Sequence, residues 1–232
     1  MSPQTSSASS EFLTASWLVL GKDLRIEWRT REIVVTAVFF AFLVTVMASL
    51  AFSGMRAVET APGAIWLPVS FASVLALTRT WQRERDDDAL TGLLLSPMPR
   101  AALYAGKAAG VCVFLAMVFA VVSVSAAMFF HVQLLPVLGP LLLLEVMGVV
   151  GLASFGTLFG AMTVRTRARD LVLASVLLPL LWPVLLTGVS ATRELLEYGA
   201  GAELGDYYAL LGVFDILGVV GGLALFGKLI EE

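Results

Sequence analysis

The sequence holds few of the residues that enzymes and metal sites depend on. Its 232 residues include one cysteine and one histidine, and only 14% of them are charged. A single cysteine excludes an internal disulfide, and one histidine with one cysteine excludes a dense zinc or haem motif. Because no nucleophile–base set or metal cluster is evident, the sequence also argues against an enzyme.

What the sequence has instead is apolar residues. They make up 59% of the chain, and the mean hydropathy is +0.90. A soluble domain has about 45–50% apolar residues. A soluble fold of this size lacks the charged side chains needed to cover so much apolar surface. The composition therefore excludes a soluble enzyme, a nucleic-acid-binding module and a disulfide scaffold, and it predicts a membrane protein.

Long apolar runs give the number of membrane crossings. One helix needs about 20 apolar residues to cross a hydrocarbon core of roughly 30 Å. The runs do not alternate between polar and apolar residues, so they predict helices rather than barrel strands. The expected fold is an all-α polytopic membrane protein with six transmembrane helices. The six stretches are Ile33–Ser53, Pro62–Thr78, Ala108–Phe130, Leu138–Thr163, Leu171–Val189 and Tyr207–Gly227.

The chain before the first span divides into two parts. Residues 1–10 are small, polar and uncharged, which predicts a disordered tail. Residues 11–31 predict an amphipathic helix lying on the membrane surface, with tryptophans at headgroup level and cations toward anionic lipid. Residues 32–232 then form the six-helix domain. The apolar positions of the surface helix are Leu13, Trp17, Leu20, Leu24 and Trp28, and its cations are Lys22, Arg25, Arg29 and Arg31.

The basic residues predict the orientation in the membrane. Of the 15 Lys and Arg residues, all but Arg56 and Arg193 fall on one side of the six spans. Loops rich in Lys and Arg stay in the cytoplasm. Both termini are therefore expected in the cytoplasm.

The cytoplasmic loop 79–107 contains a second amphipathic element. Acidic residues precede the apolar stretch Ala89–Leu95, and acids favour the start of a helix. Ser96–Pro97 then ends it, because the residue before proline avoids the helical region. The pattern predicts a short helix at about 86–96 that docks into a groove on a soluble partner. A helix resting on lipid headgroups is the alternative. The docking residues would be Asp86, Asp87, Asp88, Leu90, Leu93 and Leu94.

Three further residues are candidates for a polar or ligand site. Glu145 and Asp215 lie within predicted spans at similar depth, and intramembrane acids are costly enough to suggest a function. They are expected to face one polar cavity, or else to bond to neighbouring helices as packing contacts. His131 falls at the outer end of the third span. It is a possible haem ligand, with an ordinary interfacial histidine as the alternative.

The chain is not expected to bind nucleotide. Gly222 and Gly227-Lys228 imitate the start of a phosphate-binding loop, but Leu229 stands where Ser or Thr is needed for magnesium. The string also lies inside a predicted span and follows no strand. If ATP is used, a separate subunit supplies the site.

The middle third of the sequence resembles the B subunit of the cytochrome c maturation system, the family of haem exporter protein B, CcmB. The resemblance rests on APG-x-IW at the start of the second span, on the acidic loop with its Pro-x-Pro end, and on a lysine before the third span. The matching residues are Ala61, Pro62, Gly63, Ile65, Trp66, Leu77, Arg79, Asp86, Asp87, Gly92, Leu95, Pro97, Pro99 and Lys107. The length, the six spans and LLPLLWPVLL at 177–186 are also similar.

The resemblance implies an ABC-2-like permease of the bacterial inner membrane, a non-catalytic subunit that forms a homodimer. It implies that the helix at about 86–96 is a coupling helix that meets the family's ATPase subunit. It also implies a haem-handling membrane protein and a periplasmic haem chaperone as partners. No cofactor is expected on this chain itself. ATP would bind the partner, and haem would be exported, or released with its chaperone.

Two other functions remain open on the residues alone. A proton-coupled secondary transporter would use Glu145 and Asp215, although the two halves of the sequence show no clear repeat. A membrane scaffold without transport would use the docking helix only for adhesion. No role with nucleic acid is expected.

Overall fold

The computed structural model describes residues 4–86, 92, 95, 98–163 and 169–231. These residues form helices and short connections, with no strand among them. Six helices are long and apolar enough to cross a membrane, which confirms the predicted all-α fold with six spans. The elements are α1 (Gln4–Thr30), α2 (Glu32–Ala51), α3 (Ala57–Asp86), α5 (Arg100–Phe130), the 3-10 turn η1 (Leu135–Val137), α6 (Leu138–Thr163), α7 (Arg169–Tyr198), the 3-10 turn η2 (Gly199–Gly201) and α8 (Gly205–Glu231).

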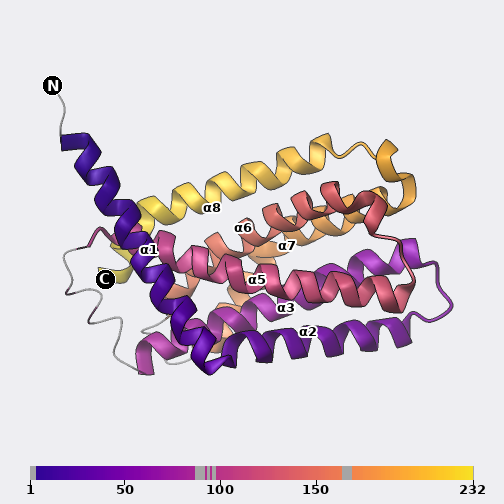
Figure 1. The fold of residues 1–232 in the computed structure, drawn as a ribbon, viewed down its shortest axis with the longest axis horizontal. Coiled ribbons are helices and arrows are strands. Elements are labelled where there is room, and N and C mark those ends of the chain that lie inside the picture. Colours follow the sequence, from indigo (N-terminus) through magenta and orange to yellow (C-terminus); the bar gives the residue numbers. More distant parts are fainter. Residues whose placement is uncertain (1–3, 87–91, 93–94, 96–97, 164–168, 232) are drawn as a thin grey trace.

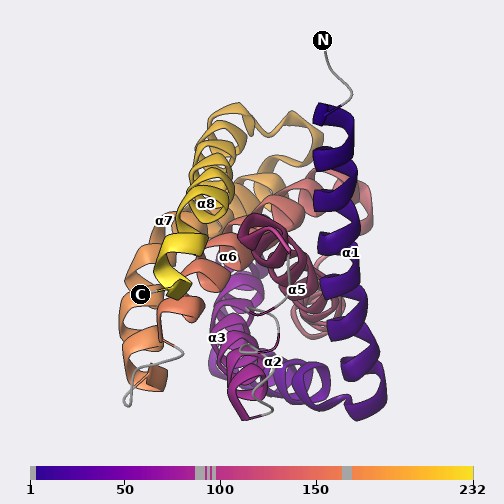
Figure 2. The ribbon, with the colours of Figure 1, turned by 90° about the vertical axis from the view of Figure 1, so that its left-hand side faces the viewer.

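The long helices form a bundle along one axis, and α1 crosses one end of it steeply (Figures 1 and 2). The end of α3, the start of α5 and the end of α8 lie at this same end (Figure 1). We call it the loop end, because residues 87–99 connect α3 to α5 there. The end of α2 and the start of α8 lie at the opposite end.

Helix α1 has one face on the protein and one face exposed. Ala15, Val19, Asp23 and Glu27 recur every four residues and are buried, and α1 packs mainly on α5. Trp17 on the other face is 73% exposed. Such a two-sided helix is typical of the boundary between protein and lipid.

The turn from α1 into α2 is fixed by local contacts. Arg31 adopts φ of 54°, the left-handed conformation that breaks the helix. The Val34 N–H donates to Glu27 Oε1 at 2.8 Å, which satisfies a free backbone donor in the first turn of α2. The two helices are therefore held at a defined angle rather than joined by a free linker.

Several helix boundaries differ from the sequence prediction. Residues 4–10, predicted as a tail, are helical in the structure, because this stretch contains no proline or glycine to stop α1. The predicted loop 79–107 is also shorter, since α3 continues to Asp86 and α5 begins at Arg100. Hydropathy ends a helix where charges begin, although a helix can extend beyond the apolar layer. The connection between α3 and α5 is therefore residues 87–99.

The centre of the bundle is organised around Trp66 of α3. This side chain is fully buried, and its indole N–H donates to Thr192 Oγ1 of α7 at 2.9 Å. Its ring lies against Gly148 of α6 and Gly188 of α7, where an added Cβ would approach it to 2.6 Å and 2.4 Å. It also meets Phe119 of α5 edge-on. One aromatic residue thus joins four helices, and glycine is required at two of its contacts.

A second, smaller core lies toward the loop end. Tyr104 of α5 is 1% exposed, and its hydroxyl oxygen lies 3.1 Å from the carbonyl oxygens of Ser154 and Gly218. Gly222 of α8 faces the Tyr104 ring so closely that no Cβ fits between them. Phe226 packs against the same ring. These contacts hold α5, α6 and α8 together directly beneath the loop end.

Candidate functional site

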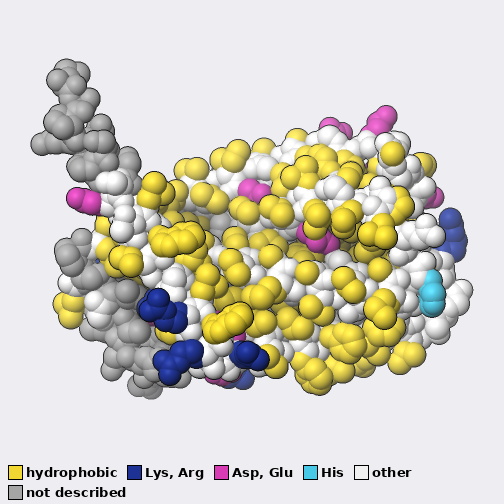
Figure 3. All heavy atoms as spheres, viewed as in Figure 1, with side chains coloured by type: hydrophobic (Ala, Val, Ile, Leu, Met, Phe, Trp, Pro, Cys, Tyr) yellow, Lys and Arg dark blue, Asp and Glu magenta, His cyan; other side chains and the backbone are white. Residues whose placement is uncertain are grey.

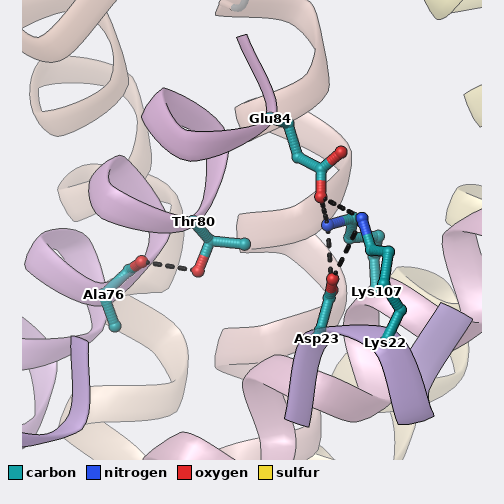
Figure 4. A network of polar contacts seen from close by, with 6 residues as sticks. All are labelled: Lys22, Asp23, Ala76, Thr80, Glu84 and Lys107. Carbon is teal, nitrogen blue, oxygen red and sulfur yellow. Dashed lines mark hydrogen bonds and ion pairs between the residues drawn. The ribbon is translucent and has the colours of Figure 1, made fainter. Parts of the chain in front are cut away.

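Four charged side chains from three helices meet at the loop end (Figure 4). Lys22 and Asp23 come from α1, Glu84 from the last turn of α3, and Lys107 from the second turn of α5. Lys22 Nζ lies 2.6 Å from Glu84 Oε1 and 3.3 Å from Asp23 Oδ1. Lys107 Nζ lies 2.8 Å from Asp23 Oδ2 and also contacts Glu84 Oε1. We call these four residues the ion cluster.

The ion cluster is largely closed to solvent. Lys107 is 2% exposed, Glu84 4% and Asp23 9%, while Lys22 is half-buried at the rim. Burying an ion costs several kcal/mol, so a buried charge persists only when it is paired. Here two ammonium groups face two carboxylates, and the group is neutral as a whole. Removing one buried member would leave a charge without compensation.

The pairing keeps Lys22 and Glu84 charged. Burial alone would raise the pKa of Glu84, but the Lys107 and Lys22 ammonium groups outweigh it and hold that pKa below its usual value. Burial alone would lower the pKa of Lys22, but the Asp23 and Glu84 carboxylates outweigh it and raise that pKa. Both residues therefore remain ionised through the physiological pH range.

The position of the ion cluster connects the loop to α1. The connection 87–99 starts three residues after Glu84 and ends shortly before Lys107. Both of its flanking helices are thus tied to α1. Glu84 of α3 contacts Lys22, and Lys107 of α5 contacts Asp23. One turn below Glu84, the Thr80 hydroxyl donates to the Ala76 carbonyl at 2.8 Å, inside α3 (Figure 4). A force on the loop would reach α1, α3 and α5 together.

The predicted docking helix falls mostly outside the described residues. Asp86 ends α3, and its side chain is not described. Asp87, Asp88, Leu90, Leu93 and Leu94 lie outside the part of the chain that the structure describes. The docking helix at about 86–96 therefore stays a prediction.

Glu145 and Asp215 have separate surroundings. Glu145 of α6 is 6% exposed and accepts a hydrogen bond from Ser123 of α5. Asp215 of α8 lies against Gly151 of α6, where an added Cβ would come within 2.9 Å of its Oδ1. Gly151 is six residues beyond Glu145, or about 9 Å along α6. Asp215 does not line the cavity that Glu145 lines, so the single shared cavity expected from the sequence is not found there.

His131 ends α5 at the end of the bundle opposite to the loop. It adopts φ of 55°, which terminates the helix, and its side chain is exposed. Figure 3 shows the histidine at that end of the bundle. Among the described residues, no group of three His, Cys, Asp or Glu residues is placed to hold a metal ion. A haem-ligand role for His131 stays a prediction.

Comparison with known proteins assigns the chain to a family. Residues 14–226 match the CcmB protein family, which is nearly the whole chain. This chain belongs to the CcmB family. It is 27% identical to the heme exporter protein B of Pseudomonas aeruginosa over 184 residues, 78% of this chain and 81% of that protein. It is 25% identical to the heme exporter protein B of Bradyrhizobium diazoefficiens over 212 residues, 90% of this chain and 94% of that protein.

The residues that carried the resemblance to CcmB have clear places in the structure. Pro62 lies in the second turn of α3, and Trp66 is the centre of the main core. Lys107 is the most buried charge of the ion cluster. Two residues of the CcmB resemblance, Trp66 and Lys107, therefore lie at the main core and at the ion cluster.

Sequence reasoning missed the ion cluster of this CcmB-family chain. Lys22 was assigned to the membrane surface, and Lys107 was noted as a cytoplasmic charge and as part of the resemblance to CcmB, without a structural role. A local signal existed on α1, because Asp23 and Glu27 continue the four-residue spacing of Ala15 and Val19. Acids buried on the side of a helix that packs against the protein require partners. That signal does not reveal that the partners lie on α3 and α5.

Proposed function

We propose that this chain is the membrane subunit of an ATP-driven complex that exports haem, or releases its haem-loaded chaperone, for cytochrome c biogenesis. Membership of the CcmB family and similarity to two heme exporter B proteins support the proposal. The six membrane-spanning helices suit an integral subunit. The chain acts as a homodimer with a haem-handling membrane protein, and a periplasmic chaperone receives the haem.

Energy comes from a partner ATPase. The glycines and lysine of the string 222–228 lie within α8, a continuous helix, so they do not form a phosphate-binding loop. The partner engages the connection 87–99 through Leu90, Leu93 and Leu94. The membrane subunit contributes no catalytic step and converts the movement of the ATPase into movement of helices.

The charge distribution supports an orientation in the inner membrane. In the sequence, all but two of the 15 Lys and Arg residues, Arg56 and Arg193, fall in segments on one side of the six predicted spans, the side that includes the connection 87–99. The positive-inside rule places that end in the cytoplasm, with both chain termini. The loop end is then the end that a cytoplasmic ATPase can reach.

The buried ion cluster is the observation that carries the mechanism. Lys22, Asp23, Glu84 and Lys107 join α1, α3 and α5 at the base of the loop (Figure 4). Separating the buried members would cost several kcal/mol, so the three helix ends move as one unit. A push by the ATPase on the loop is thereby transmitted to the surface helix and to two transmembrane helices at once.

Co-purification tests this function most simply. The tagged chain is purified from its native membranes in mild detergent, and ATP hydrolysis is measured in the purified material. We expect an ATPase to co-purify and to be lost when Leu90, Leu93 and Leu94 are each replaced by Asp. The matched control replaces the exposed Phe52 and Met55, in the connection between α2 and α3 at the opposite end, by Asp, and it should retain the ATPase. Absence of an ATPase from the wild-type preparation would contradict the proposal.

A further inference from the structure

A long groove lies between α5 and α6, in the half of the bundle away from the loop end. It has a volume of about 990 Å³ and is lined almost entirely by apolar side chains. Its lining on α5 runs from Cys112 to Met128, about 24 Å along the helix axis. Figure 3 looks onto the side of the bundle formed by α5, α6 and α8, where acidic side chains interrupt the hydrophobic surface. The groove is therefore a long apolar trough within the membrane-spanning region.

The α5 wall of the groove is made of small side chains. They recur every three or four residues, and Ala116 and Ala120 are exposed in the groove. A face of small residues allows another helix to approach closely, which is the main way that helices pack inside a membrane. The small residues of this wall are Cys112, Ala116, Ala120, Ser123 and Ala127.

One ionisable side chain lies in the wall of this groove. Glu145 of α6 is 6% exposed, lines the groove and accepts a hydrogen bond from the Ser123 hydroxyl. A carboxyl in the apolar layer is costly, and one hydroxyl compensates it far less than the two ammonium groups compensate Glu84. Glu145 is seven residues into α6, about 10 Å below the end of that helix. The groove thus presents an acceptor for hydrogen bonds at one fixed depth.

We propose that this groove seats a membrane-spanning helix of a different protein, which places a hydrogen-bond donor on its side chain at the depth of Glu145. The length and the small-residue wall match a helix, and the carboxylate matches a donor or a cation on that helix. The inference stands on the groove alone and does not depend on the proposed function.

Other occupants fit the groove less well. Acyl chains would fill the apolar volume, but they carry no donor for Glu145. The headgroup of a lipid lies at the membrane surface, and Glu145 lies about 10 Å below the end of α6, so a headgroup offers no donor at that depth. A second copy of this chain meeting it through the same surface would bring two concave faces together and leave the trough empty. A helix from another protein satisfies the shape and the acid together.

Site-specific photocrosslinking tests the inference in native membranes that contain the full complex. A benzophenone amino acid replaces Met128, a long exposed side chain that lines the groove, and the photoproduct is identified by mass spectrometry. We expect a crosslink to a membrane-spanning peptide of another protein, within one helical turn of a donor side chain. A photoproduct with phospholipid, with haem or with a second copy of this chain would overturn the proposal.

Two pairs of variants test whether the shape of the groove and the Glu145 side chain bind the partner helix. Ala120→Phe fills the groove and should lower the yield of the Met128 crosslink at least tenfold, whereas Val121→Phe, next to it on α5 but outside the groove, should not. Glu145→Leu should also lower the yield, whereas Glu145→Gln keeps an acceptor oxygen and should retain it. A charge exchange, Glu145→Lys with the partner's donor changed to Glu, should restore the crosslink. An unchanged yield in both Ala120→Phe and Glu145→Leu would contradict the proposal.

Discussion

Glu84 and Glu145 are both buried glutamates, but their surroundings differ. Glu84 contacts the ammonium groups of Lys22 and Lys107, and the three side chains belong to three different helices. Glu145 has one neutral partner, the Ser123 hydroxyl on the neighbouring helix, and it lines an open groove. The two acids lie at opposite ends of the membrane-spanning region.

The difference distinguishes the ion cluster around Glu84, a closed joint between helices, from Glu145, an open contact site. An acid whose charge is balanced inside the chain fixes the relative positions of its helices. An acid balanced by one hydroxyl leaves part of its bonding capacity for another molecule. We therefore propose separate roles for the two acids, with transmission of force at Glu84 and contact with a partner at Glu145.

Removing the Lys107 ammonium group from the closed joint should have the largest effect on stability. Lys107→Met leaves Asp23 and Glu84 facing Lys22 alone, so we expect a loss of about 3–5 kcal/mol in the free energy of unfolding. Thermal unfolding in lipid nanodiscs measures it. Arg56→Met, which breaks the exposed Arg56–Glu59 pair at the opposite end, is the control and should cost less than about 1 kcal/mol. Equal losses in the two variants would show that the ion cluster is not a buried joint.

The stability of the core around Trp66, which lies between Glu84 and Glu145, should depend on side-chain volume rather than on charge. Gly188→Ala places a Cβ 2.4 Å from the nearest atoms of the Trp66 ring, which is closer than van der Waals contact allows. We therefore expect a loss of about 1–3 kcal/mol in the free energy of unfolding. Gly63→Ala places a Cβ where no atom lies within 4 Å and should be neutral or slightly stabilising. The same unfolding measurement compares them. A neutral Gly188→Ala would contradict the central position of Trp66.

Removing the Ser123 hydroxyl that bonds to Glu145 should destabilise the fold less than removing the Lys107 ammonium group from the ion cluster. Ser123→Ala removes the hydroxyl that donates to Glu145, and we expect a loss of about 1 kcal/mol in the free energy of unfolding. The comparison variant is Ser49→Ala on α2, whose hydroxyl bonds only to the carbonyl of Val46 in its own helix. If Ser123→Ala were as damaging as Lys107→Met, the distinction between a closed joint and an open site would fail.

Lowering the pH should weaken the closed joint, because it protonates Glu84. Its folded pKa lies below the ordinary value of 4.5, so its stabilisation is complete above that value and is lost as the pH falls through the folded pKa. The difference in melting temperature between wild type and Glu84→Gln should therefore shrink between about pH 5 and about pH 3. A constant difference across that range would show that the carboxylate charge does not stabilise the fold.

Much of the fold was predictable because its signals are local. Hydropathy located six spans, and the apolar spacing of Leu13, Trp17 and Trp28 indicated a helix within α1. The ends of α3 and α5 were misplaced, because charged residues there continue the helices beyond the apolar layer. The separate surroundings of Glu145 and Asp215 could not be predicted, since they depend on how α6 and α8 pack.

The ion cluster was not predictable from one sequence for a related reason. Lys22 and Glu84 are separated by 62 positions, and no periodicity of α1 indicates which helix will cover it. The burial of Asp23 follows from the four-residue spacing of its neighbours, but its partner Lys107 follows only from tertiary packing. The groove was missed likewise, because it arises from the distance between two helices.

The central claim is that the ion cluster transmits the movement of the ATPase. The most direct test measures ATP hydrolysis and haem export together in the reconstituted complex carrying Glu84→Gln, with Glu59→Gln at the opposite end as the matched control. The account predicts that Glu84→Gln keeps ATP hydrolysis near the wild-type rate while haem export falls at least tenfold, and that the control changes neither. Haem export that stays at the wild-type level in Glu84→Gln would contradict the account.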